Sequence, residues 1–209
     1  MIKYIYNNKY IIEVEKMSKF KDLVLQNRSY RGYDNHVTQT KETLMALVDH
    51  ARLMPAAKNA QPLKYFLAYE KAVVDQIQAH TNWAGLLADL NLPFAGEKPT
   101  SFIVVLQDTD LEPALAQFKT DVGIAGATIT LAAAEMGLGC CMIGSFSAAG
   151  VKEVMKLPEA LSPVLVIAVG KPNEKIVLTE AVDGNIAYYR DEDNVHYVPK
   201  RKLEDIIFD

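Results

Sequence analysis

The sequence predicts an α+β fold in which helices pack around a mixed sheet. Two strongly apolar runs, at 102–106 and 164–170, are too short to span a bilayer and are expected to be buried strands. Apolar residues recur at helical spacing before and between these runs. The chain has 209 residues, 50% hydrophobic and 23% charged, which suffices for a packed core and excludes wholesale disorder.

Up to residue 100, the pattern alternates helices with one strand. Phe20, Leu23 and Val24 have the spacing of a short opening helix. Thr40 is a good N-cap for a second helix, whose apolar residues share one face until Pro55 stops it. Three further elements are expected in this order: a strand over 65–69, a helix over 72–80, and a loop with a helical turn over 81–99.

Beyond residue 100, helical spacing continues after the 102–106 strand over six turns, from 115 to 136. Gly137 is expected to end this helix in a left-handed conformation. Small residues inside the helix weaken it unless another backbone approaches closely, and they are Gly123, Gly126 and Ala127. The rest is expected as an extended stretch starting at Ile143, a helix capped by Ser147 and running to 157–158, the 164–170 strand, and a polar tail.

Composition limits the partners and the compartment. Twenty-two Lys and Arg against 26 Asp and Glu give a net charge of −4, which disfavours a nucleic-acid partner. Cys140 and Cys141 are adjacent and cannot easily form a disulfide, so we expect a reduced, cytoplasmic protein without a membrane anchor. Residues 1–17 are expected to be an N-terminal extension outside the fold, with Met17 an alternative start and an extra edge strand the alternative role. Residues 18–209 are expected to form one domain.

Several catalytic signatures are absent from the sequence. There is no GxGxxG, Walker A, GxSxG or HExxH motif, and the four histidines lack metal-ligand spacing. We therefore expect no metal site and no catalytic side chain. An enzyme of this sequence would take its chemistry from a cofactor.

Three segments could bind such a cofactor, although each has a plainer interpretation. The stretch 27–33 places two arginines around Ser29 and could hold a phosphate, or it is a solvated basic turn. The stretch 55–62 is a proline-bounded turn whose amides suit the edge of a heteroaromatic ring, or it is a helix-to-strand connector. The glycines of 137–146 allow a flat ligand to approach the backbone, or they form a helix cap and a tight turn.

Taken together and in this order, these segments resemble the nitroreductase family of FMN-dependent oxidoreductases. Gly170-Lys171-Pro172 and the basic stretch 200–202 stand where the family has its Gly-Lys-Pro-like turn and its C-terminal basic patch. The resemblance covers about residues 18–209. It implies a three-layer arrangement with a central mixed or antiparallel sheet flanked by helices.

The resemblance also implies a role for each matching residue. Arg28 and Ser29 would hold the FMN phosphate from one side, with Lys200 or Arg201 closing the site from the other. Arg31 would lie beside flavin N1 and O2. The remaining matches would contact the ring system. The flavin edge would be contacted by Pro55, Ala56, Ala57 and Asn59. Flavin N5 would be contacted by Ile143, Gly144 and Ser145. Two departures stand out: Asn27 replaces a frequent basic phosphate ligand, and alanines replace the serines of the Pro55–Ala57 turn.

The resemblance implies transfer of electrons from NADH or NADPH through FMN to a nitroaromatic, a quinone or another conjugated acceptor. It also implies a homodimer with the flavin at the subunit interface. Two alternatives stay open from the sequence: a flavin-binding or flavin-sensing protein without efficient turnover, and an interaction module without flavin.

Overall fold

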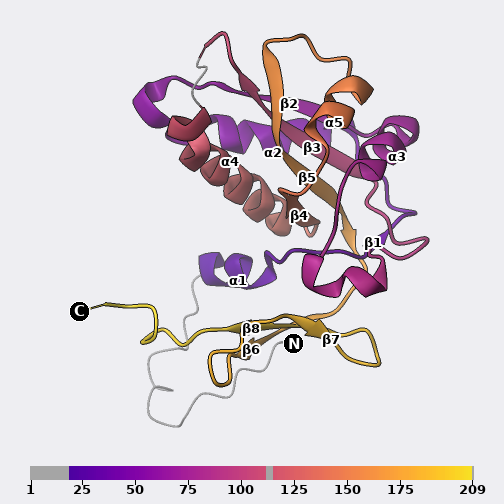
Figure 1. Cartoon of the computed structure of the whole chain (residues 1–209), viewed down its shortest axis with the longest axis vertical. Helices are drawn as coiled ribbons and strands as arrows, with labels where there is room; N and C mark the ends of the chain where they lie inside the picture. The colour runs from indigo at the N-terminus through magenta and orange to yellow at the C-terminus, as the bar shows by residue number, and fades with distance from the viewer. Residues whose placement is uncertain (1–18, 112–114, 209) are drawn as a thin grey trace. The chain divides into compact units, whose positions relative to one another are not determined.

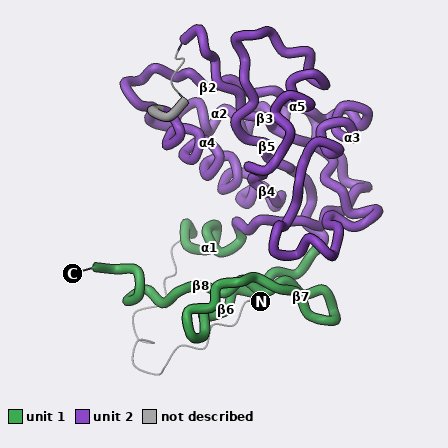
Figure 2. The backbone as a smooth tube through the Cα atoms, in the orientation of Figure 1, with its two compact units in different colours: residues 1–26, 174–209 green, residues 27–173 purple. Residues whose placement is uncertain are grey.

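The computed structural model describes residues 19–111 and 115–208, with side chains from 118 onward in the second range. The predicted extension at 1–17 lies outside the described residues. The chain divides into two compact units (Figure 2). One comprises 27–173, and the other joins 174–208 to the N-terminal residues described up to Gln26.

The larger unit is built on a five-stranded antiparallel sheet (Figure 1). The central strand β5, Leu161–Pro172, pairs on one side with β3, Ser101–Asp108, which in turn pairs with β2, Leu63–Ala68. On its other side β5 pairs with β4, Gly139–Ile143. The short β1, Tyr33–Asp34, pairs with the last two residues of β5, Lys171 and Pro172. The predicted strands at 65–69, 102–106 and 164–170 are therefore present, each with somewhat different ends.

Helices cover both faces of this sheet, which confirms the three-layer α+β fold (Figure 1). Alternate residues of β3 point to opposite faces, because side chains alternate along a strand. Ile103 and Val105 pack with α2, Lys41–Arg52, and α4, Leu115–Glu135. Phe102 and Val104 pack with α3, Lys71–Ala79, and α5, Ala148–Val154. Two short 3₁₀ segments, η1 at Ala57–Asn59 and η2 at Gly85–Leu90, lie in the connections.

Helix ends follow the predicted capping chemistry. The backbone N–H of Thr43 donates to Thr40 Oγ1 at 3.2 Å, and that of Gly150 donates to Ser147 Oγ at 3.2 Å. Gly137 has a φ of +69° and ends α4, as expected of a glycine at this position. Each cap satisfies a backbone group that the helix leaves without a partner.

Two predictions for the larger unit are wrong. Extended structure does not start at Ile143 but ends there, because Gly139–Ile143 pairs along its whole length with β5. The helix capped by Ser147 ends at Val154 rather than at 157–158, and Lys156 follows with a left-handed φ of +49°.

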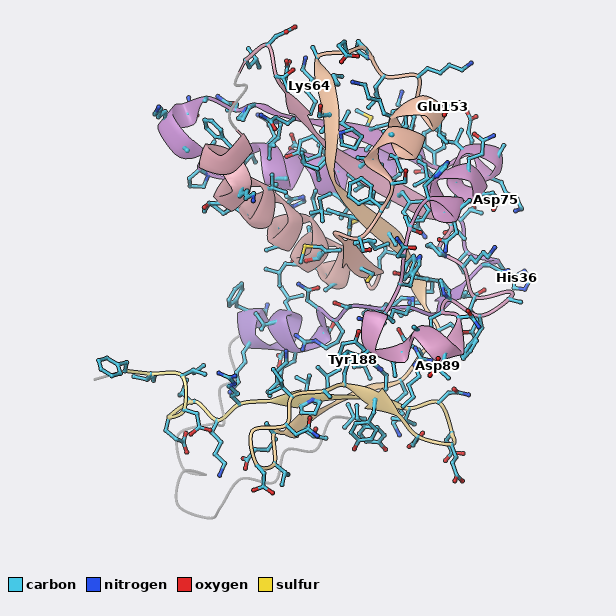
Figure 3. All side chains as sticks on the ribbon, in the orientation of Figure 1. His36, Lys64, Asp75, Asp89, Glu153 and Tyr188 are labelled. Carbon is cyan, nitrogen blue, oxygen red and sulfur yellow. The ribbon has the colours of Figure 1, made fainter. Side chains whose placement is uncertain are left out.

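An ion pair joins the edge strand β2 to β3. Lys64 Nζ lies 2.5 Å from Asp108 Oδ2, and this hydrogen bond lowers the pKa of the Asp108 carboxyl (Lys64 is labelled in Figure 3).

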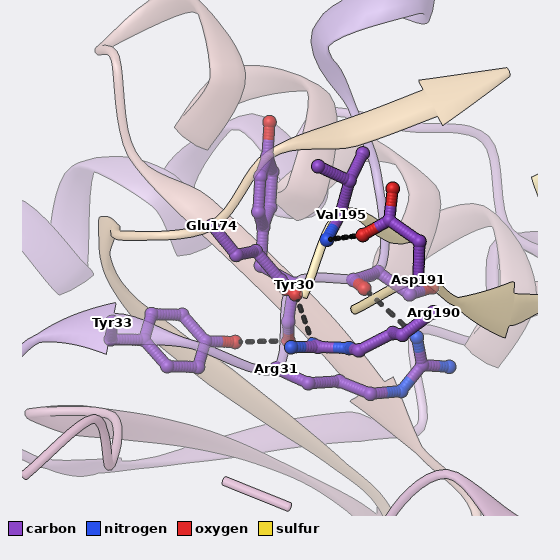
Figure 4. A network of polar contacts seen from close by, with 8 residues as sticks. Tyr30, Arg31, Tyr33, Glu174, Arg190, Asp191 and Val195 are labelled. Carbon is purple, nitrogen blue, oxygen red and sulfur yellow. Dashed lines mark hydrogen bonds and ion pairs between the residues drawn. The ribbon is translucent and has the colours of Figure 1, made fainter. Parts of the chain in front are cut away.

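The smaller unit holds α1, Lys19–Gln26, and a three-stranded sheet where a polar tail was expected. Strand β6, Ile176–Glu180, is parallel to β8, His196–Lys200, and β7, Tyr189–Arg190, is antiparallel to β8. A buried ion pair joins Arg190 to Glu174, and the backbone N–H of Val195 donates to Asp191 Oδ1 at 2.9 Å (Figure 4). The tail strands were missed because their buried residues do not alternate with the period of 2 that marks a half-buried strand.

We predict that Gly139→Ala destabilises the protein while Gly144→Ala does not. A Cβ on Gly139 would lie 2.5 Å from the Tyr30 ring and 2.6 Å from Pro172, whereas one on Gly144 would meet nothing within 4 Å. Overpacking of this kind costs about 1–3 kcal/mol. Urea unfolding of both variants measures the difference, and equal stability of the two would contradict the packing described here.

Candidate functional site

The segment with the two arginines is fastened to the beginning of β4. Ser29 forms an isolated parallel bridge with Cys140, and the backbone N–H of Tyr30 donates to Cys140 O at 2.9 Å. Within the segment, Arg31 Nη1 donates to Ser29 O at 3.2 Å, and Tyr33 Oη donates to Tyr30 O at 2.8 Å (Figure 4). The guanidinium of Arg31 is therefore held beside the backbone carbonyl of Ser29.

The glycine segment lies at the far end of the same strand. Ile143 is buried, whereas Gly144 and Ser145 are exposed. Gly144 follows Cys140 by four positions, which corresponds to about 13 Å along a strand. The space that a Cβ on Gly144 would occupy is open, but the corresponding space at Gly139 is filled by Tyr30 and Pro172. Of these two glycines, only Gly144 leaves room for a ligand against the backbone.

Asn82 holds this far end and was missed by the sequence analysis. Its backbone N–H donates to Ser145 O at 2.9 Å, and its Nδ2 donates to Ser145 Oγ at 3.3 Å. Thr81 also forms an isolated bridge with Phe146. Asn82 lies in a loop 63 residues earlier in the chain, and no pattern in the sequence indicates that the two segments meet.

The proline-bounded turn at 55–62 is tied to α4 by Asp121, which the sequence analysis also missed. The Asp121 carboxylate, in a residue only 6% exposed, accepts from the backbone N–H of Ala57 at 3.0 and 3.2 Å. Three residues of the turn, Lys58, Asn59 and Gln61, have φ of +54°, +52° and +49°. A left-handed residue other than glycine costs about 1–2 kcal/mol, and such strain concentrates at functional sites.

The site residues predicted from sequence fall into separate groups. Arg28, Ser29 and Arg31 lie at one end of β4, with Ile143, Gly144 and Ser145 at the other. Pro55 and Ala56 line a different hollow of about 140 Å³, to which Ala57, Asn59 and the β4 group do not contribute. Its polar lining includes Arg52, Gln61, Tyr65 and Asp121, and burial raises the pKa of the Tyr65 hydroxyl.

Lys200 and Arg201 belong to the smaller unit, where Lys200 ends β8. The Lys200 carbonyl accepts from Ala181 N at 2.8 Å, which ties this residue to the segment after β6. The next residue, Lys202, forms an ion pair with Glu180 at 3.1 Å. Lys200 and Arg201 are both exposed, so their side chains are accessible to an anion.

Asn27, noted from sequence as a lost phosphate ligand, has a role within the fold. Its Nδ2 donates to Thr130 Oγ1 on α4 at 2.9 Å. An amide suits this contact, because the Thr130 hydroxyl itself donates to Ala127 O at 3.0 Å and is left as an acceptor. Asn27 therefore anchors the beginning of the arginine segment to the long helix.

Cys140 is poorly suited to redox chemistry of its own. Both cysteines are buried and neither forms a disulfide, and burial raises the pKa of the Cys140 thiol above its usual range. Within the described residues there is no cluster of three or more potential metal ligands. No helix in the described ranges is both long enough and apolar enough to cross a membrane.

Comparisons with known proteins show the family of the chain. A family model described as the nitroreductase family matches residues 24–171. A protein of Methanothermobacter thermautotrophicus, whose name joins NADH dehydrogenase with NAD(P)H nitroreductase, is 26% identical over 78% of this chain and 81% of its own. An oxygen-insensitive NADPH nitroreductase of Helicobacter acinonychis is 25% identical over 66% of this chain and 79% of its own.

Among solved structures, a nitroreductase family protein of Streptococcus pneumoniae has a TM-score of 0.66 at 18% identity, covering 91% of this chain and all of the other. One from Clostridium difficile has a TM-score of 0.60 at 23% identity, over 76% of this chain and 86% of its own. These two likenesses concern the fold alone. The family match and the curated relatives identify the chain as an oxidoreductase. The chain belongs to the nitroreductase family.

We predict that Asp121→Ala loosens the turn and that Asp121→Asn does so much less. The alanine variant leaves the Ala57 N–H without its charged acceptor, a loss of about 1.5–3 kcal/mol, whereas asparagine keeps an acceptor oxygen. Hydrogen exchange at the Ala57 amide, followed by NMR, measures the effect directly. Wild-type protection of that amide in Asp121→Ala would show that Asp121 does not hold the turn.

Proposed function

We propose that the protein is an FMN-dependent oxidoreductase that takes electrons from NADH or NADPH and passes them to a nitroaromatic, a quinone or another conjugated acceptor. Strand β4 carries the proposal. The segment that contains Arg28, Ser29 and Arg31 lies beside the beginning of β4, and about 13 Å along the strand the backbone at Gly144 is open and exposed. An elongated molecule with an anionic end and a flat ring matches both ends.

The residues at each end fit the parts of FMN. Arg28 and Ser29 would provide forked cationic donors and a hydroxyl for the phosphate, and Lys200 or Arg201 would add positive charge. Arg31 would stabilise negative charge on the ring system near N1 and O2. The backbone of Ile143, Gly144 and Ser145 would face the reactive edge of the ring, with Asn82 keeping that backbone in place. When bound, FMN supplies the hydride-accepting chemistry that no side chain of this site provides.

We further propose that the active form is a homodimer. Pro55 and Ala56 of the turn line a hollow to which the β4 group does not contribute, so a turn contributed by a second copy would complete the site. Gly123 and Ala127 lie one turn apart on α4 and are exposed, and a Cβ on Gly123 would meet nothing within 4 Å. Gly126 does not share this face, because it lies against Met142 of its own sheet. The close approach between copies would therefore involve Gly123 and Ala127. The two free cysteines support a reducing, cytoplasmic location.

We predict that Arg28→Ala and Arg201→Ala each weaken FMN binding by about tenfold to a hundredfold, since a hydrogen bond to a charged group contributes about 1.5–3 kcal/mol. Riboflavin, which lacks the phosphate, should bind weakly to the wild type and be little affected by either change. Titration of apo-protein with both flavins, followed by flavin fluorescence, measures this. Lys71→Ala is the matched control, because Lys71 is an exposed cation whose partner is Asp75 on the same helix.

Each arm of this titration has a separate meaning. Unchanged FMN affinity in Arg201→Ala would remove the C-terminal basic stretch from the site. Unchanged affinity in Arg28→Ala would contradict the phosphate site itself. A wild-type protein that binds neither flavin would overturn the proposed function and favour an interaction module.

A further inference from the structure

The amides of Asn59 and Gln61 form a contact with a defined direction. Gln61 Nε2 donates to Asn59 Oδ1 at 3.1 Å and, in a longer contact, to the backbone carbonyl of Asn59 at 3.4 Å. A backbone carbonyl can only accept a hydrogen bond. The Gln61 group that reaches it must therefore be the NH₂ end of the side chain.

This direction determines how the Asn59 side chain is oriented. Because Gln61 presents N–H groups, the Asn59 atom that it meets must be the acceptor Oδ1. The Nδ2 of Asn59 then points away from Gln61, and it has no hydrogen-bond partner in the part of the chain that the structure describes. Asn59 thus offers two N–H donors to whatever lies beside the turn.

The backbone of the turn keeps the two side chains in this arrangement. Asn59 and Gln61 both have left-handed φ, at +52° and +49°, with Ala60 between them. The N–H of Asn59 donates to Ala56 O at 2.9 Å, and that of Ala60 donates to Ala57 O at 3.0 Å. The Asp121 carboxylate and the flanking prolines hold the same turn from outside. The amide pair is therefore ordered before any ligand binds.

We infer that Gln61 is a positioning residue, which orients the Asn59 amide so that its N–H groups face the flavin edge and require a hydrogen-bond acceptor there. The inference rests on the proposed function, in which Asn59 meets the flavin. A ring carbonyl oxygen or an unprotonated ring nitrogen satisfies this requirement, whereas a ring N–H does not. Gln61 itself needs no contact with the flavin.

The test is Gln61→Glu, which keeps the shape of the side chain and removes its donors. A carboxylate can only accept, so Asn59 should turn its NH₂ group toward Glu and its oxygen toward the flavin. We expect about tenfold weaker binding of both FMN and riboflavin, which corresponds to losing one well-placed hydrogen bond. The melting temperature of the apo-protein should stay close to that of the wild type, since both residues are exposed.

Two further variants separate orientation from charge and from folding. Gln76→Glu adds the same charge on the exposed side of α3 and should bind both flavins as the wild type does. Gln61→Asn keeps an uncharged amide and a residue that tolerates left-handed φ, but its side chain is one methylene shorter. It should weaken both flavins by about threefold to fivefold.

The outcomes distinguish the inference from the function on which it rests. If the wild type binds FMN and Gln61→Glu binds each flavin as tightly as the wild type does, Gln61 does not orient Asn59. Weakening of FMN alone would assign the effect to repulsion of the phosphate, and would also overturn the inference. A wild type that binds neither flavin removes the proposed function first, and the role of Gln61 with it.

Discussion

The pairing of strand β5 is the constraint on which the rest of the larger unit depends. This strand pairs with β3, β4 and β1, so it aligns every part of the sheet except β2. Val166, Ile167, Ala168 and Val169 are fully buried between the two helical layers. Burying a side chain of the size of valine or isoleucine contributes about 1.5–3 kcal/mol. The sheet is therefore rigid where the site residues attach to it.

Strand β4 positions the residues of the candidate site relative to this sheet. Five consecutive residues of β4 pair with β5, and the arginine segment then pairs with Cys140 near the beginning of β4. Asn82 donates hydrogen bonds to Ser145, just beyond the end of β4. A ligand that reaches from Arg28 to Gly144 would thus lie along a strand whose two ends cannot move independently. Such preorganisation reduces the entropy lost on binding.

Sequence reasoning succeeded where local chemistry decides the structure. Thr40, Gly137 and Ser147 act at helix ends because of their own side chains or the lack of one, and the apolar runs of β3 and β5 are long enough to identify buried strands.

The errors occurred where distant segments decide the structure. Strand β4 was expected to begin where it ends, because Gly139 and the two cysteines are not strand-forming in isolation and are held by β5. Asp121 reaches a backbone amide 64 positions away, and Asn82 reaches Ser145 from a loop. Neither contact leaves a periodic pattern. The strands of the smaller unit were missed because the residues of β6 and β8 do not alternate between buried and exposed positions.

The central claim is that this chain moves electrons through bound FMN, and the two half-reactions test it most directly. The FMN-loaded protein is mixed with NADH or NADPH without oxygen, and the flavin absorbance band is followed before and after adding a nitroaromatic or a quinone. We predict that the band bleaches with at least one nucleotide and returns with the acceptor. A yellow protein whose band changes with neither nucleotide would contradict the account and identify a flavin-binding protein without turnover.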